Sequence, residues 1–235
     1  MDAVRSPYPL QLTARLDEPL SRWRWLVKWF LALPHVLALV GLWVALVVTT
    51  AVAGVAILFT GRYPRSLFDF NVGVLRWTWR VSYYAFDGLG TDRYPPFSLQ
   101  PDPSFPADLE VRYPEHLRRG LVLVKWWLLA LPHYLVVAVF AGGGWSVRSG
   151  TDSGWMWTFG GLIGLLVCFA GIALLFTDRY PKSIFDFVMG MNRWVFRVAA
   201  YSSLMTDSYP PFRLDMGGDE SPAKIVAPTS PPVTS

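Results

Sequence analysis

Three long apolar runs constrain the fold of this chain more than any other feature. Residues 26–60 and 121–141 are each interrupted only by one lysine and one histidine, and residues 155–177 contain no charged residue. A helix of about 20 residues crosses the hydrocarbon core of a bilayer, so runs of this length are typical of membrane helices. Only 16% of the residues are charged, against about 25% in soluble domains. The sequence therefore predicts an integral membrane protein.

The chain also contains an internal repeat. Residues 26–35 (LVKWFLALPH) return as residues 123–133 (LVKWWLLALPH), with one additional residue in the second copy. Three further phrases return in the same order: LFTGRYPRSLFDF as LFTDRYPKSIFDF, an Arg-Trp pair with a following arginine, and TDRYPPFSL as TDSYPPFRL. So many ordered matches indicate a duplication. We expect repeat 1 at residues 8–99, a linker at 100–104, repeat 2 at 105–214 and a disordered tail at 215–235.

The two repeats differ most between their LPH and LFT phrases. Repeat 2 carries glycines and the polar segment Ser146–Gly154 there, which predicts a loop between two transmembrane helices. By analogy, repeat 1 is expected to form a shorter hairpin that turns near Gly41–Ala45. The alternative is one long tilted helix, since 35 helical residues would extend roughly 52 Å.

The positions of the basic residues predict the orientation in the membrane. Lysines and arginines cluster before and after both predicted hairpins, and only one of the 21 lies between the LPH and LFT phrases. The positive-inside rule places these clusters, and both termini, on the cytoplasmic face of the membrane. The repeats would then be parallel, related by an axis along the membrane normal. The net charge of +4 is explained by anionic lipid headgroups and does not call for nucleic acid.

After each predicted hairpin the sequence favours an amphipathic helix, at residues 66–87 and 183–204. Four arginines share the polar faces of these helices: Arg76, Arg80, Arg193 and Arg197. A basic helix with an aromatic opposite face is typical of the membrane interface. The favoured interpretation is a solvated face that only anchors the protein. The arginines are also candidates for contact with lipid headgroups or an acidic partner, and the remaining alternative is a third buried span with internal Asp–Arg pairs.

Short stretches with alternating apolar residues open and close each repeat. Leu10, Leu12 and Ala14 open the first, and Leu109 and Val111 open the second. The closing phrases are residues 97–99 and 212–214. A period of two residues predicts strands, so four strands could form a small cytoplasmic sheet. The expected fold is thus mainly α, with two parallel membrane repeats, each a helical hairpin plus an interface helix, and short β-strands.

His35 and His133, which follow the proline of each LPH phrase, are the candidate functional residues. Proline removes a backbone hydrogen bond and favours a kink, and an ionisable residue within a membrane helix suggests function. The two histidines could face each other across the axis between the repeats, as in a proton relay, or each could lie at the membrane edge bonded to a neighbour. No catalytic motif, cofactor site or metal cluster is recognised, and the single Cys168 excludes an internal disulfide.

The duplicated phrases KWxLALPH, LFTxRYPxxxFDF and DxYPPF resemble those of an uncharacterised family of bacterial membrane proteins. That family is found mainly in actinobacteria and is described as a domain of unknown function. The resemblance covers about residues 8–214. It implies a multi-pass plasma-membrane protein and assigns no activity.

Three functions remain open at this level. The favoured one is a membrane scaffold or accessory subunit that binds a membrane-protein partner on its basic cytoplasmic face. The second is a small transporter or channel with a path between the repeats. The third is an enzyme that modifies lipid, for which Asp69, Asp186 and the two histidines are the available groups.

Overall fold

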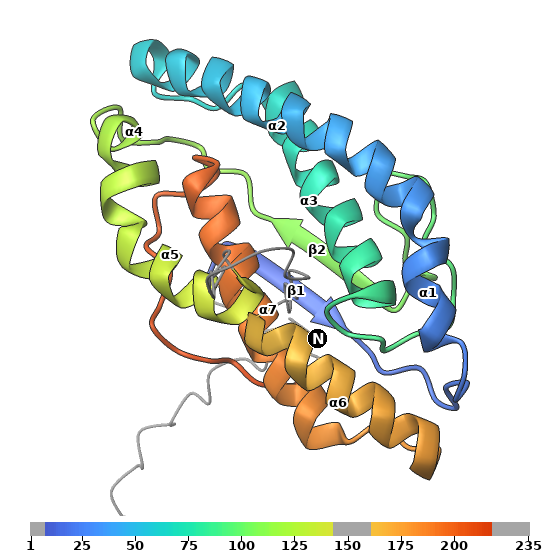
Figure 1. Ribbon diagram of the computed structural model, residues 1–235. Helices are drawn as coiled ribbons and strands as arrows, with labels where there is room; N and C mark the ends of the chain where they lie inside the picture. Colours follow the sequence, from blue (N-terminus) through green and yellow to red (C-terminus); the bar gives the residue numbers. More distant parts are fainter. Residues whose placement is uncertain (1–7, 143–160, 218–235) are drawn as a thin grey trace, which may run out of the picture.

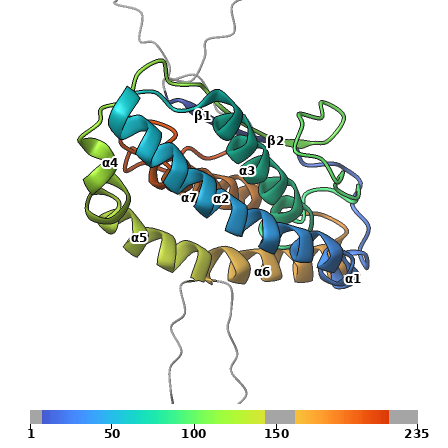
Figure 2. The same ribbon diagram turned by 90° about the horizontal axis from the view of Figure 1, so that it is seen from above.

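The computed structural model describes residues 8–142 and 161–217 and shows three layers. A two-stranded sheet forms one outer layer, two amphipathic helices form the middle, and two long helical rods form the other outer layer (Figures 1 and 2). The described residues are mainly helical, as the sequence predicts.

The first half contains β1 (Leu10–Ala14), α1 (Trp25–Leu31), α2 (Leu33–Thr60) and α3 (Arg65–Ala85). The second contains β2 (Ala107–Val111), α4 (Leu121–Val124), the π-helix η1 (Lys125–Leu129), α5 (Leu131–Val137), the π-helix η2 (Ala138–Gly142), α6 (Gly161–Thr177) and α7 (Lys182–Ser202). We call α1 with α2 rod 1, and α4 through α6 rod 2.

The hairpin expected within the apolar run of repeat 1 is not formed. Helix α2 runs for 28 residues without a turn at Gly41–Ala45, so the alternative of one long helix is the correct one. The physical reason is that the run offers no polar loop residues. A turn among leucines and valines would leave backbone groups unpaired in apolar surroundings, whereas a continuous helix pairs them all.

Rod 2 does not turn back on itself either. Gly142 ends η2 and Gly161 begins α6, and a Cβ atom on Gly161 would lie 2.3 Å from the amide nitrogen of Gly142. Gly142 and Gly161 are therefore adjacent, and α6 continues along the line of α5 (Figure 2). Both glycines have positive φ angles, a conformation that glycine adopts without strain and that ends η2 and begins α6 here. The predicted loop Ser146–Gly154 lies outside the described residues.

The hairpins that do form join each rod to the amphipathic helix that follows it. Helix α2 packs against α3, and α6 packs against α7. The RYP phrases make the connections, because Pro64 and Pro181 are the N-caps of α3 and α7. The two amphipathic helices thus exist at the predicted positions, but the rods and the sheet cover them.

A π-helical turn accommodates the extra residue of the second LPH phrase. Lys28 and His35 are joined by α1 and the start of α2, whereas Lys125 and His133 are joined by η1, which packs one more residue into its turn. The lysine and the histidine therefore keep corresponding positions in both rods, despite the different spacing in the sequence.

Strands β1 and β2, the predicted opening strands, form an antiparallel pair in which Leu12 lies opposite Leu109. Helix α3 packs on β2 and α7 packs on β1, so each amphipathic helix contacts the strand of the other half. One buried core contains residues from both halves. The predicted closing strands are wrong, since residues 97–99 and 212–214 are irregular.

The π-turn can be tested by deletion. Removing Leu128 from rod 2 gives the spacing of rod 1, so η1 should become α-helical while Lys125 and His133 stay in place. We expect the free energy of unfolding, measured thermally in detergent micelles, to change by no more than about 1 kcal/mol.

Deletion of Phe30 from α1 is the matched control. It turns Lys28 by about 100° relative to His35 and should cost roughly 3 kcal/mol or more, because a buried charge loses its partner. Equal damage from the two deletions would contradict this account of η1.

Candidate functional site

The repeated phrases of each half meet in space at one place. The LPH phrase of the rod, the Arg-Trp pair of the amphipathic helix and the TDxYPP phrase at the end of the repeat converge on a buried histidine and a buried lysine. We call each such group a clasp. Clasp 1 comprises Lys28, His35, Trp77, Thr91, Asp92, Tyr94 and Phe97, and clasp 2 comprises Lys125, His133, Trp194, Thr206, Asp207, Tyr209 and Phe212.

In clasp 1 an aromatic cage encloses His35. The imidazole stacks on Phe97 with ring centroids 3.9 Å apart and lies 4.8 Å from the ring of Tyr94. Trp77 meets it edge-on and donates a hydrogen bond of 3.1 Å from Nε1 to Nδ1 of His35. His35 is fully buried as a result.

Clasp 2 repeats this geometry around His133. Its ring stacks on Phe212 at 4.3 Å and lies 4.8 Å from Tyr209, and Trp194 donates a 3.1 Å hydrogen bond to its Nδ1. Because Nδ1 accepts a hydrogen bond in both clasps, the proton of each neutral imidazole belongs on Nε2. Among the described residues, Nε2 has no hydrogen-bond partner in either histidine.

Each clasp also buries a lysine. Lys28 donates to the carbonyl of Thr91 at 2.7 Å, and its Nζ lies 2.9 Å from a carboxylate oxygen of Asp92. Burial lowers the pKa of Lys28 below the ordinary lysine value, and the ion pair with Asp92 opposes that shift. The backbone amide of Ser21 donates to the same carboxylate, so the charge pair also fixes the chain entering rod 1.

The second lysine makes the same contacts. Lys125 donates to the carbonyl of Thr206 at 2.8 Å and to Asp207 at 2.5 Å, and the amide of Arg118 donates to Asp207. The lysines lie over tyrosine rings as well, Tyr84 in the first case and Tyr201 in the second.

The tyrosines of the clasps bond to the backbone near the proline. The hydroxyl of Tyr94 donates to the carbonyl of Leu31, and that of Tyr209 donates to the carbonyl of Leu129. Proline interrupts the helical hydrogen-bond pattern in this part of each rod. The TDxYPP phrase therefore fastens the end of each repeat to the kinked start of its own rod.

The two histidines do not form the predicted pair. Each is enclosed by rings of its own repeat, and the start of α2 lies far from α5 in both views (Figures 1 and 2). The prediction assumed that each kink faced the axis between the repeats. In the structure the kinks face the YPPF segments instead, because the aromatic rings cover the histidines there.

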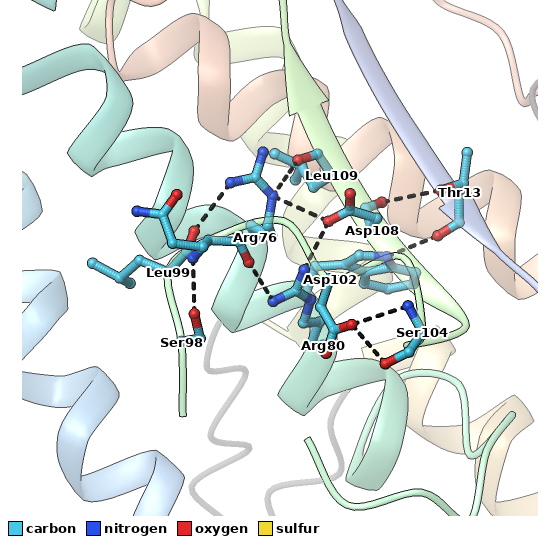
Figure 3. A network of polar contacts seen from close by, with 11 residues as sticks. Thr13, Arg76, Arg80, Ser98, Leu99, Asp102, Ser104, Asp108 and Leu109 are labelled. Carbon is cyan, nitrogen blue, oxygen red and sulfur yellow. Dashed lines mark hydrogen bonds and ion pairs between the residues drawn. The ribbon is translucent and has the colours of Figure 1, made fainter. Parts of the chain in front are cut away.

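The arginines of α3 point toward the sheet (Figure 3). Nε of Arg76 donates to the carbonyl of Leu109 and also lies 3.0 Å from a carboxylate oxygen of Asp108. Arg80 shares that carboxylate at 3.1 Å and donates to the carbonyl of Gln100.

The arginines of α7 are bound in a similar way. Nε of Arg193 donates to the carbonyl of Leu12, and its Nη1 donates to the carbonyl of Asp215. Arg197 forms an ion pair of 2.6 Å with the Asp215 carboxylate. Asp215 is thus held in the fold, although the sequence assigned it to the tail. The tail from residue 218 onward lies outside the described residues.

All four arginines are at most 7% exposed, so they are not placed to contact headgroups or a partner. The predicted role fails because helical periodicity identifies a polar face without saying what covers it. Here the sheet and the closing phrases cover it.

A groove of about 700 Å³ lies where the start of α3 meets the ends of the strands. Its walls carry both charges, with more arginine than carboxylate. The lining residues are Pro9, Gln11, Arg65, Phe68, Asp69, Phe70, Val72, Arg76, Leu99, Gln100, Pro101, Glu110, Val111 and Arg112. Asp69, one of the carboxylates considered for an enzyme that modifies lipid, forms an ion pair with Arg65 in this groove.

Within residues 8–142 and 161–217, no group of three or more histidine, cysteine or acidic side chains is placed to hold a metal ion. The candidate carboxylates Asp69 and Asp186 stand near the starts of α3 and α7 and are not brought to the histidines, which lie inside the clasps.

These features define a duplicated helical protein whose repeated phrases assemble two internal clasps. The family model described as a domain of unknown function (DUF4389) matches residues 22–98 and 155–213, more than half of the chain. The chain belongs to this family. The first match runs from the start of rod 1 through clasp 1, and the second includes α6, α7 and the YPPF segment of clasp 2. No curated protein and no solved structure matches the chain.

Sequence reasoning missed the lysines and the TDxYPP phrases as parts of one site. The sequence did contain a sign of this pairing. The phrase with the lysine and the TDxYPP phrase with the aspartate each occur once per repeat, in the same order, and a lysine or an aspartate is costly to bury unless it is paired. The distance of about 60 residues between Lys28 and Asp92 concealed their pairing.

The charge pair of clasp 1 should be essential for stability. Lys28→Met removes the cation, so the Thr91 carbonyl loses its hydrogen bond and Asp92 keeps only the Ser21 amide and the more distant Arg24; this should lower the free energy of unfolding by about 3 kcal/mol. Thermal unfolding in detergent micelles measures the loss, and Lys125→Met should show the same effect in clasp 2.

The double variant Lys28→Met/Asp92→Asn is the control. It removes both charges and should recover part of the stability lost by Lys28→Met alone. A single variant as stable as the parent chain would show that the pair contributes nothing.

Proposed function

We propose that the protein is a bacterial plasma-membrane scaffold or accessory subunit, with its sheet and both termini on the cytoplasmic side. One observation carries this proposal. The polar side chains of the repeated phrases bind one another inside the clasps and the arginine networks. Two outer surfaces therefore stay available for interactions, namely the apolar rods and the polar sheet with its groove.

Membrane residence is supported by the composition and exposure of the rods. Leu33–Thr60 and Leu121–Gly142 are long and apolar enough to cross a bilayer. Only 17% and 22% of their most apolar windows are buried within the protein, whereas a core helix of a soluble protein would be mostly buried. An uncovered apolar surface of this extent requires lipid or protein against it.

A transporter or an enzyme is less well supported by the same contacts. Aromatic rings from both halves pack together between the repeats, with Trp79 against Phe196 and Tyr83 against Phe185. A polar path along this axis would have to displace them. The histidines are enclosed by rings, which fits a structural role better than proton transfer or lipid chemistry.

The groove beside the sheet is the proposed docking site for a membrane-protein partner. Arg112 follows β2, is exposed and lines the groove, as does the exposed Arg65, which is paired with Asp69. An acidic segment of a partner would pair with Arg112, because opposite charges across an interface attract.

Affinity purification in mild detergent tests the proposal, with Arg112→Glu as the docking variant. A partner present in stoichiometric amount should co-purify with the parent chain and fall at least tenfold with Arg112→Glu, because the new carboxylate repels an acidic segment. Arg15→Glu is the matched control, since Arg15 is exposed, follows β1 and lies outside the groove.

The outcomes are distinct. A parent chain that purifies without any stoichiometric partner would overturn the scaffold proposal. A partner that is lost equally from both variants would exclude the groove as its docking site.

A further inference from the structure

The apolar surface of the described chain is one face of the molecule. The outward side chains of rod 1 include Leu37, Val48 and Phe59, exposed by 76%, 56% and 77%. Those of rod 2 include Leu135 and Phe176, exposed by 67% and 78%. The sheet lies on the opposite side of α3 and α7 (Figure 2). A protein that spans a bilayer needs an apolar belt between two polar ends, whereas this one has an apolar face and a polar face.

The two rods run in opposite directions within that face. Gly54 near the end of rod 1 lies against Val122 at the start of rod 2, and Trp25 at the start of rod 1 lies against Gly171 near the end of rod 2. Arg22 forms an ion pair with Asp178 at that second junction.

Basic residues occur at both junctions in equal number. Arg22 and Arg24 precede rod 1 where Arg179 and Lys182 follow rod 2, and Arg62 and Arg65 follow rod 1 where Arg118 and Arg119 precede rod 2. The amide of Leu117 donates to the carbonyl of Gly61, which joins the chain segments of the second group.

This distribution discriminates between two orientations. If the rods crossed the bilayer, each side would receive four basic residues, and the cytoplasmic bias of lysine and arginine would disappear. If the rods lie in the plane of the membrane, all eight lie at one headgroup layer, where anionic lipids attract them.

The length of α2 agrees with the second orientation. Helix α2 alone has 28 residues, or roughly 42 Å, whereas the hydrocarbon core is about 30 Å thick. A crossing α2 would have to tilt or extend its apolar ends into the headgroup regions, and a helix that lies in the plane of the membrane has no such mismatch.

From these observations we infer that both rods lie in the plane of a single leaflet that contains anionic lipids, with the clasps at the headgroup level and the sheet in water. The inference rests on the proposed membrane location and adds the orientation of the rods in the membrane. The axis relating the repeats then stands along the membrane normal, and none of the described helices crosses the bilayer.

Spin-label depth measurements test this arrangement. Leu37, Val48 and Phe59 are spaced by 11 residues, which is close to three helical turns, so they share one face of α2. Each is replaced singly by cysteine in a Cys168→Ser background, labelled and reconstituted in vesicles of phosphatidylglycerol and phosphatidylcholine. Accessibility to oxygen and to a water-soluble nickel chelate reports the depth.

We expect the three labels to lie at similar depths, protected from the nickel chelate. A label at Thr13, on the outer face of the sheet, is the control and should be open to the chelate. Circular dichroism of each variant excludes misfolding as the cause of a changed depth.

The other outcomes separate the inference from the proposed function. A label at Val48 much deeper than those at Leu37 and Phe59 would mean that α2 spans the bilayer, which overturns the inference and leaves the membrane location intact. Labels open to the chelate at all three positions would overturn the membrane location itself. Labels shielded from both reagents would mean that a second protein copy, not lipid, covers the rods.

Discussion

The structure depends on two arginines that cross from one half of the chain to the other. Arg76 on α3 binds the carbonyl of Leu109, and Arg193 on α7 binds that of Leu12, while these two leucines lie opposite each other in the sheet. A two-stranded sheet is marginally stable by itself. Here a helix from each half binds the sheet at its central pair, Leu12 and Leu109, so the sheet joins the two repeats. Neither half has a complete core without the other.

Burying these arginines has a cost that the surrounding groups must offset. Moving a guanidinium from water into the protein is unfavourable unless its donors are bonded and its charge is paired. Asp108 in β2 supplies the countercharge for Arg76. Asp215 accepts a hydrogen bond from Arg193 at its carbonyl, and its carboxylate pairs with the neighbouring Arg197. Corresponding arginines of the two repeats are therefore bound by carboxylate residues at non-equivalent positions.

The accuracy of the sequence predictions follows the range of the interactions involved. Helices α3 and α7 and strands β1 and β2 were predictable, because their periodicity depends on neighbouring residues. The hairpins within the rods were wrong, since an insertion in repeat 2 resembled an inter-helix loop although its ends meet at Gly142 and Gly161. The clasps were missed because stacking between His35 and Phe97 joins residues far apart in the chain. The contacts of the arginines with the sheet were missed because Arg76 binds β2 and Arg193 binds β1, each in the opposite half.

The junction of Gly142 and Gly161 also separates the rod from what is inserted in it. A segment whose two ends meet at one point places no demand on the length or the direction of the helix on either side. Helices α5 and α6 therefore owe their alignment to their own packing against α7. Repeat 1, with its unbroken α2, is the same design without an insert.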